Sequence, residues 1–207
     1  IENKYRKTLE RRAKLTGIGL HSGRAANLTL HPAQSGTGIV FKHPQFASTI
    51  TANTDSVIDT SYAVTLGNNE WRVQTVEHLM AALAVCGITD VICEIDSMEV
   101  PILDGSSKPF LEAIKDAKTK EFSDPVEPLQ VHNPIWVMDG DKYIICLPSD
   151  ELKISYTIDF RHPKIKSQTL TVSMEAELFE REILGARTFG FLDQVENLQS
   201  QGLALGG

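Results

Sequence analysis

The chain has 207 residues, 42% of them hydrophobic and 23% charged, a composition typical of a folded globular protein and unlike that of a disordered one. Its formal net charge of −7 disfavours nonspecific binding to nucleic acid, which requires a basic surface, and we expect no nucleic-acid partner. No segment approaches the roughly 18 to 20 consecutive apolar residues of a transmembrane span, and the first residues contain no apolar signal region, so we expect a cytoplasmic protein.

The first 123 residues alternate predicted strands with two predicted helices. Apolar and polar side chains alternate in the segments predicted as strands, which are residues 27–31, 62–66, 71–73 and 90–95. Residues 75–86 predict a helix that ends at Gly87, because apolar side chains recur there at helical spacing: Val76, Leu79, Met80 and Leu83. Residues 107–117 predict a second helix, with Ser106 as its N-cap.

The segment 124–134 contains three prolines and no regular period, and it predicts an interdomain linker. Four further strands are predicted beyond it, at residues 135–138, 142–147, 152–160 and 169–172, and Asp139-Gly140 joins the first two as a hairpin. Two helices follow, about residues 174–183 behind Ser173 as N-cap and about residues 193–201. The sequence therefore predicts an α+β fold with domains at residues 1–123 and 135–207, the second of them incomplete.

The clearest chemical signal lies in the first turn of the helix predicted at residues 75–86. At 100° per residue, Glu77 and His78 point away from the apolar stripe, and a helix amino terminus favours an ionised carboxylate. The pair could act as a general base beside a metal ligand, although spacing alone favours a solvated surface pair. His78 has no second ligand three or four residues on, and the three cysteines form no CxxC pair.

Three other segments are unusual for simple packing. Residues 17–23 place three glycines and His21 within seven positions, which indicates either an ordinary turn or a backbone held close to a ligand. Residues 104–107 predict a turn that leads into the second helix. Residues 187–191 set Thr188 and two aromatic side chains around a glycine, either for packing or for binding.

Five motifs and a terminal segment follow one another along essentially the whole chain. They are TGIGLHSG (16–23), TVEHLMAAL (75–83), EVPILDGSSKPF (99–110), IDFRHP (158–163), ARTFGF (186–191) and QGLALGG (201–207). In this order and spacing they resemble the UDP-3-O-acyl-N-acetylglucosamine deacetylases, the zinc amidases of bacterial lipid A synthesis. The resemblance implies two related α+β domains, each with a mainly antiparallel sheet and two helices. It also implies that the helices pack between the sheets and that the active site lies at the domain junction.

The resemblance also implies an activity, which is hydrolysis of the 2-acetamido group of an acylated UDP-N-acetylglucosamine to a free amine and acetate. By motif, Glu77 is the general base, Thr188 donates to the oxyanion, and His78 is one of three ligands to Zn²⁺. The same resemblance assigns the small-molecule substrate to Leu20, Tyr62, Ala63, Phe160, Phe189 and Phe191, with His21 and Arg187 at the rim of the site.

The sequence departs from the family pattern in one important respect. The other two zinc ligands of the family lie in an HKxxD motif, and these 207 residues contain neither that motif nor the family's later catalytic histidine. A catalytic zinc needs about three protein ligands, so we expect these residues alone neither to hold zinc tightly nor to turn over substrate. The alternative is a catalytically silent module that binds sugar nucleotide or acyl chain. A purely structural protein gives no reason for placing Glu77, His78 and Thr188 together.

Overall fold

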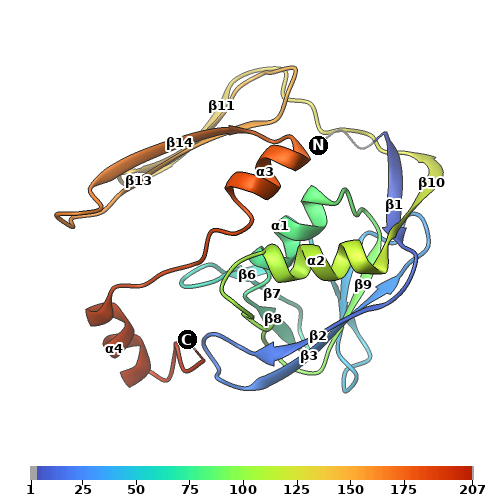
Figure 1. The fold of residues 1–207 in the computed structure, drawn as a ribbon, viewed down its shortest axis with the longest axis horizontal. Helices are drawn as coiled ribbons and strands as arrows, with labels where there is room; N and C mark the ends of the chain where they lie inside the picture. The colour runs from blue at the N-terminus through green and yellow to red at the C-terminus, as the bar shows by residue number, and fades with distance from the viewer. Residues whose placement is uncertain (1–3, 207) are drawn as a thin grey trace.

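The largest sheet lies in the first half of the chain. The computed structural model describes residues 4–206 (Figure 1). The sheet has the order β2-β3-β9-β4-β5, formed by β2 (Ala13–Ile18), β3 (Ala25–Pro32), β9 (Val91–Ile95), β4 (Ile39–Lys42) and β5 (Thr49–Thr51). Only the pairing of β4 with β9 is parallel. The strands predicted at residues 27–31 and 90–95 are confirmed in β3 and β9.

One face of this sheet is covered by α1 (Glu77–Val85) and α2 (Lys108–Ala117), which contact each other. Of the apolar side chains that predicted this helix, Val76, Leu79 and Leu83 are buried and Met80 is half-buried, and the predicted helix is confirmed. The helix begins two residues later than predicted, because Thr75 has φ = 60°, outside the helical region. Gly87, with φ = 67°, ends it as expected.

The N-cap predicted for α2 is displaced by one residue. Ser107, not Ser106, occupies that position, and its side chain makes no capping hydrogen bond. Ser106 still serves the helix start, because its Oγ accepts a hydrogen bond from the Lys108 N–H at 3.2 Å.

A second, three-stranded sheet consists of β6 (Val57–Asp59), β7 (Thr65–Gly67) and β8 (Arg72–Gln74), preceded by the short 3₁₀ helix η1 (Thr54–Ser56). The strand predicted at residues 62–66 was wrong in its first half, because β7 begins only at Thr65. The physical reason is a local turn: the Asp59 carboxylate accepts hydrogen bonds from the N–H and the hydroxyl of Ser61. Residues 61–64 therefore form a loop.

The second half begins after β10 (Thr119–Pro125), which pairs with β1 (Tyr5–Leu9). Residues 126–134 form no helix or strand. Beyond them lie two separate hairpins and two helices, formed by β11 (Ile135–Asp139) with β12 (Lys142–Cys146), β13 (Lys153–Asp159) with β14 (Ser167–Ser173), α3 (Ala176–Glu182) and α4 (Leu192–Ser200). The N-cap predicted at Ser173 was wrong, because Ser173 is paired with Lys153 in the sheet and Glu175 precedes the helix. The domain boundaries at residues 124–134 stay a prediction.

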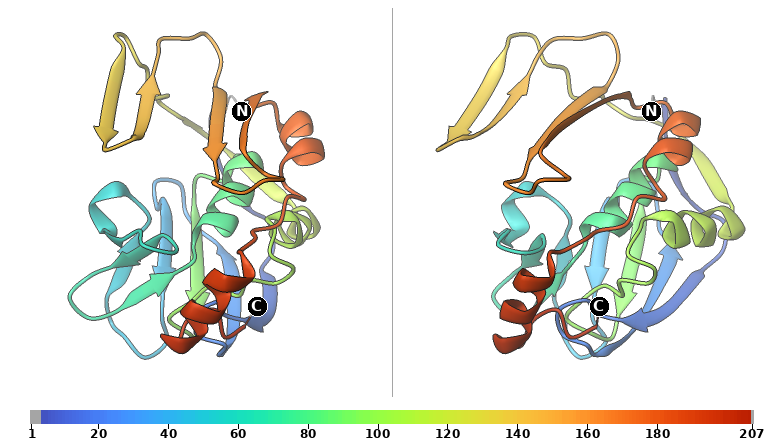
Figure 2. Two further views of the ribbon diagram at one scale, coloured as in Figure 1. Left: turned by 90° about the vertical axis from the view of Figure 1, so that its left-hand side faces the viewer. Right: turned by 60° about the vertical axis from the view of Figure 1, so that its left-hand side comes forward.

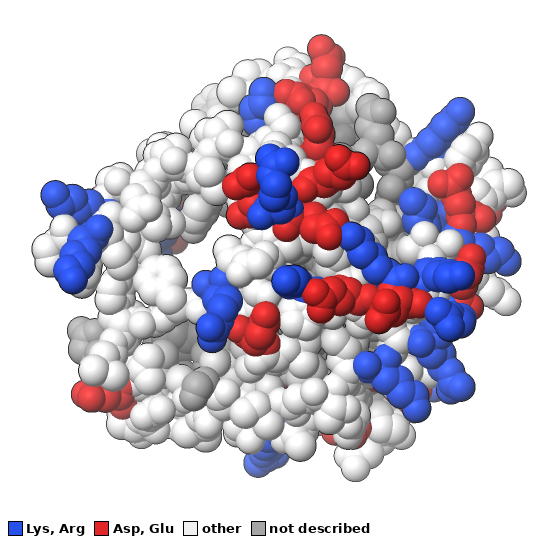
Figure 3. Space-filling view, viewed as in Figure 1, with Lys and Arg blue, Asp and Glu red and all other residues white. Residues whose placement is uncertain are grey.

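Helices α1, α2 and α3 lie between the five-stranded sheet and the two hairpins (Figures 1 and 2), in an α+β arrangement. Helix α4 lies apart from them, near the end of β2. Over α2 and α3 the surface alternates acidic and basic side chains (Figure 3), and Lys115 joins Glu180 across the two helices at 2.6 Å. Within residues 4–206, no helix has the length and apolar character needed to cross a bilayer.

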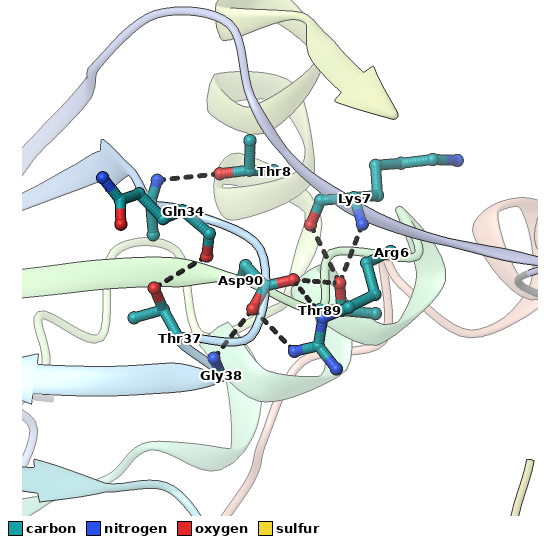
Figure 4. A network of polar contacts seen from close by, with 9 residues as sticks. Arg6, Lys7, Thr8, Gln34, Thr37, Gly38, Thr89 and Asp90 are labelled. Carbon is teal, nitrogen blue, oxygen red and sulfur yellow. Dashed lines mark hydrogen bonds and ion pairs between the residues drawn. The ribbon is translucent and has the colours of Figure 1, made fainter. Parts of the chain in front are cut away.

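A buried ion pair fixes the amino-terminal strand to the five-stranded sheet (Figure 4). The Asp90 side chain is fully buried and accepts hydrogen bonds from Arg6 Nε at 2.9 Å and Nη2 at 2.6 Å. The Thr89 hydroxyl and the Gly38 N–H also donate to it. Burial opposes ionisation of this carboxyl, but these hydrogen bonds and the Arg6 charge outweigh burial and hold the pKa of Asp90 below its usual value.

We expect Asp90→Asn to lower the free energy of unfolding by about 3 kcal/mol at pH 7, because it removes the charge of a fully buried carboxylate and leaves the partly buried Arg6 guanidinium without its partner. Since the native pKa of Asp90 is depressed, its contribution is complete above the unfolded-state pKa and is lost as the pH falls through the native one. Urea unfolding at pH 7 and below pH 4 measures both effects. Asp116→Asn, at an exposed site, is the control, and an equal loss at both pH values would contradict the assignment.

Candidate active site

The start of α1 places the predicted base against a loop of the neighbouring sheet. Glu77 is half-buried, and its Oε2 accepts a hydrogen bond from the Val64 N–H at 3.2 Å. Ala63, in the same loop, is buried, whereas Tyr62 is exposed and its ring lies 6.4 Å from the ring of His21. Three of the residues assigned by motif, Glu77, Tyr62 and Ala63, therefore belong to one neighbourhood.

His78 follows Glu77 and is also half-buried. Among the residues that the structure describes, its ring nitrogens have no hydrogen-bond partner. The expectation that the Glu77-His78 pair leaves the core is thus only partly met, because neither side chain is fully solvated. A half-buried imidazole without a protein partner is free to accept a ligand or a metal ion.

A buried carboxylate organises the glycine-rich loop beside this helix start. Glu99 is 2% exposed, and its Oε1 and Oε2 accept hydrogen bonds from the His21 and Ser22 N–H groups, both at 2.8 Å. Its Oε1 also accepts from the Thr75 hydroxyl at 3.0 Å. Gly19 is required here, because a Cβ atom at that position would overlap the Glu99 carboxylate and the Ser22 hydroxyl.

The His21 side chain is buried, and its ring nitrogens make no hydrogen bonds within the described residues. Its ring is 5% exposed, and neither Nδ1 nor Nε2 has a hydrogen-bond partner within residues 4–206. Leaving a buried polar group unpaired costs about 1–3 kcal/mol, and native proteins do so mainly where a ligand, ion or water binds. This observation favours a binding site next to Tyr62 and Leu20, of which Leu20 is half-buried.

The second half of the chain docks its ARTFGF motif on the turn before α2. The Thr188 N–H donates to the Gly105 carbonyl at 2.8 Å, and Gly105, with φ = 87°, adopts a conformation that favours glycine. Burial opposes ionisation of Asp104, but hydrogen bonds from Ser106 and the nearby Arg187 charge lower the pKa of Asp104. This turn therefore holds both Arg187 and Thr188.

Three aromatic residues assigned by motif to the substrate gather in one cluster. The ring centroids of Phe160, Phe189 and Phe191 lie 5.4 to 5.8 Å apart, edge to face. The ring of His162 stacks on Phe191, with the ring centroids 5.3 Å apart. The Phe189 side chain is 59% exposed, so the cluster offers an aromatic surface to a ligand.

The segment after α4 returns to the glycine-rich loop. The Gly206 N–H donates to the Leu20 carbonyl at 3.0 Å, and the Leu205 N–H donates to the His21 carbonyl at 3.4 Å. The stretch from residue 188 to residue 206 is therefore fixed to the first half at both of its ends. It joins the neighbourhood of Thr188 to that of His21.

Some of the expected contacts are not made within the part of the chain that the structure describes. There, no hydrogen bond or ion pair joins Glu77 or His78 to Thr188, and no three side chains of His, Cys, Asp or Glu gather as a metal site. His78 by itself cannot hold a catalytic zinc, which needs about three protein ligands. The described residues alone do not fit the metal.

Reasoning from the sequence did not single out two residues that organise this region, Glu99 and Thr75. Each is the first residue of a motif, and neither was predicted to have a role. A glutamate that follows a buried strand and precedes Val-Pro is a weak signal, and burial of its side chain can be recognised only when the glycine-rich loop is placed against it. The positive φ of Thr75 has no signal in its residue type.

The comparisons with known proteins agree with the motifs. The family model described as "LpxC: UDP-3-O-acyl N-acetylglycosamine deacetylase" matches residues 6–207. The chain belongs to this family. It is 50% identical over 206 residues to a UDP-3-O-acyl-N-acetylglucosamine deacetylase of Leptospira biflexa serovar Patoc, covering 98% of this chain and 68% of that protein.

Two further LpxC relatives carry the same name. The protein of Citrifermentans bemidjiense is 44% identical over 205 residues, which cover 98% of this chain and 67% of the relative. That of Myxococcus xanthus is 48% identical over 203 residues, which cover 97% of this chain and 65% of the relative. The chain thus spans about two thirds of the length of these relatives.

Gly19→Ala tests the packing of the glycine-rich loop on Glu99. We expect a loss of about 1–3 kcal/mol in the free energy of unfolding, because the added methyl must displace a buried carboxylate and the backbone around it. Gly185→Ala is the matched control, since a Cβ there meets no atom within 4 Å. Urea unfolding compares the two variants, and equal midpoints would show that the loop does not pack against Glu99.

Proposed function

We propose that this chain hydrolyses the 2-acetamido group of UDP-3-O-acyl-N-acetylglucosamine to a free amine and acetate, as part of lipid A biosynthesis. The observation that carries the proposal is family membership over residues 6–207. The partner is a small-molecule substrate, and we propose a cytoplasmic location. The geometry of the site supports the reaction through the residues considered below.

Glu77 has the position and the chemistry of a general base. One carboxylate oxygen is oriented by the Val64 N–H, so the other can accept a proton. In the proposed step a water oxygen attacks the acetamide carbonyl carbon while Glu77 takes one of the water protons. When the C–N bond breaks, the proton passes to the leaving nitrogen, giving the amine and acetate.

Thr188 is the proposed donor to the oxyanion that forms during this attack. Its backbone is fixed by the hydrogen bond to Gly105, which leaves the hydroxyl available to a ligand. One well-placed donor of this kind contributes about 3 kcal/mol to transition-state stabilisation. The proposal requires Thr188 and Glu77 to reach the same bound acetamide from the two halves of the chain.

The remaining motif residues supply surfaces for the rest of the substrate. The cluster of Phe160, Phe189 and Phe191 provides aromatic faces for stacking, and Arg187 provides a positive charge nearby. Leu20, Tyr62 and Ala63 lie on the side of His21 and Glu77, where apolar walls can contact the acyl or sugar groups. The exposed ring of Tyr62 and the unpartnered ring of His21 lie near each other there, with ring centroids 6.4 Å apart.

We propose Zn²⁺ as the cofactor, with His78 as one ligand and Glu77 beside it. The family resemblance implies two further ligands in an HKxxD motif, which these 207 residues do not contain. The steps above therefore use only the residues of this chain.

Acetate release from UDP-3-O-acyl-N-acetylglucosamine tests the activity directly, using the full-length protein in which these residues occur. We expect turnover that falls by about 10² to 10⁴ in Glu77→Gln, because the isosteric amide cannot take a proton from water. Chelation should abolish the same activity. Glu112→Gln, an exposed substitution on α2, should leave it unchanged.

The alternative, a silent module that binds sugar nucleotide or acyl chain, makes a different prediction in the same assay. It predicts saturable substrate binding by calorimetry with no acetate at any zinc concentration. This alternative is favoured by the absence of a three-ligand metal group within the described residues. Binding without turnover in the full-length protein would replace the enzyme proposal.

Metal content tests His78 as a zinc ligand. We expect the 207-residue chain to retain far less than one zinc per molecule after gel filtration, because one imidazole is too few ligands. The full-length protein should retain one zinc and lose it in His78→Ala. Elemental analysis measures both, and a full equivalent of zinc on the 207-residue chain would contradict the proposed ligand set.

A further inference from the structure

We propose that Glu99 is the positioning residue of this site, which sets the first turn of α1, and therefore Glu77 and His78, in register with the glycine-rich loop. The inference rests on the proposed function for its catalytic consequence. The hydrogen bonds of Glu99 are observed whether or not that function is correct. Glu99 has no role in the proposed reaction. It is nevertheless the only carboxylate among the described residues that accepts hydrogen bonds from both the glycine-rich loop and the start of α1.

The glycine-rich loop surrounds the Glu99 carboxylate with donors. Successive N–H groups of His21 and Ser22 point at its two oxygens, each at 2.8 Å, in the manner of an anion-binding backbone nest. The Gly23 N–H closes the loop on the Gly19 carbonyl at 3.0 Å. The carboxylate thereby fixes the backbone that carries the buried, unpartnered ring of His21.

The same carboxylate reaches the helix start through Thr75. The Thr75 hydroxyl donates to Oε1 at 3.0 Å, and Thr75 lies two residues before Glu77. A β-branched residue at φ = 60° is held in a conformation that it adopts only when its surroundings impose it. The hydrogen bond to Glu99 is the side-chain contact that imposes it, and the direction in which α1 departs depends on this residue.

The backbone around Glu99 repeats the same connections. The Gln74 N–H donates to the Met98 carbonyl at 2.9 Å and the Val100 N–H donates to the Gln74 carbonyl at 3.0 Å. On the other side, the Ile102 N–H donates to the Ile18 carbonyl at 2.9 Å. The segment 98–102 is therefore inserted between the end of β2 and the end of β8, with its one charged side chain directed at both.

The donors around Glu99 need both of its side-chain oxygens as acceptors. Within residues 4–206 no lysine or arginine forms an ion pair with it, so the three hydrogen bonds alone compensate its burial. A glutamine has the same shape but only one acceptor oxygen. Its NH₂ group would face an N–H or hydroxyl donor, and at least one of the three bonds would be lost.

Kinetics of the full-length protein test the proposal with Glu99→Gln. We expect kcat to fall about 10²-fold with KM little changed, because a base displaced by about 1 Å loses catalysis and not substrate contacts. Thr75→Val, which removes only the hydroxyl, should lower kcat about tenfold, and Thr75→Ser should restore it. Glu112→Gln is the charge-matched control, expected to behave as the wild type. Wild-type kcat in Glu99→Gln and Thr75→Val would overturn the positioning role.

Hydrogen exchange gives a readout that does not need activity. We expect Glu99→Gln to speed amide exchange both at residues 19–23 and at residues 75–80, and Thr75→Val to speed it at residues 75–80 alone. If the wild type releases no acetate, the proposed function fails, and this exchange pattern still decides the positioning role. Faster exchange confined to residues 19–23 in Glu99→Gln would overturn it, because the carboxylate would then order the loop without reaching α1.

Discussion

The arrangement of the site depends on one buried carboxylate, that of Glu99. Glu99 accepts two backbone N–H groups from the glycine-rich loop and one hydroxyl from the residue that precedes α1. Loss of any hydrogen bond to a buried carboxylate is energetically costly. The glycine-rich loop and the start of α1 are therefore fixed relative to each other. The glycine at position 19 and the unusual backbone of Thr75 follow from this constraint.

Asp90 shows how differently the same fold uses its other fully buried carboxylate. Asp90 is paired with Arg6, and together they fix the amino-terminal strand to the five-stranded sheet. Glu99 has no cationic partner within the described residues, and it accepts hydrogen bonds from the glycine-rich loop and from Thr75, which both belong to motifs. A cation beside Glu99 would also attract any anionic group bound nearby. Neutral N–H and hydroxyl donors hold the Glu99 carboxylate without adding a positive charge to the site. The first carboxylate serves stability, and the second serves the geometry of the site.

Sequence periodicity predicted the parts of the fold that apolar packing controls. Strands β3 and β9 and helices α1 and α2 lie where Leu28, Cys93, Leu79 and Ile114 indicated, since their burial sets the period. Polar side chains account for two wrong predictions. The turn at Asp59 leaves only the second half of the strand predicted at residues 62–66, and Ser173, predicted as an N-cap, is paired in a sheet instead. The motifs predicted roles for Glu77, His78 and Thr188 but none for Glu99, because the contacts of Glu99 are with segments distant in the sequence.

The central claim is that the start of α1 and the segment after α3 meet around one bound acetamide and one metal ion. Anomalous diffraction at the zinc edge, from crystals of the full-length protein with zinc and a substrate analogue, tests it most directly. The account predicts a zinc peak about 2.0–2.1 Å from a ring nitrogen of His78, with the Glu77 carboxylate and the Thr188 hydroxyl around the acetamide carbonyl. A zinc peak away from His78, or a Thr188 hydroxyl turned away from the carbonyl, would contradict it.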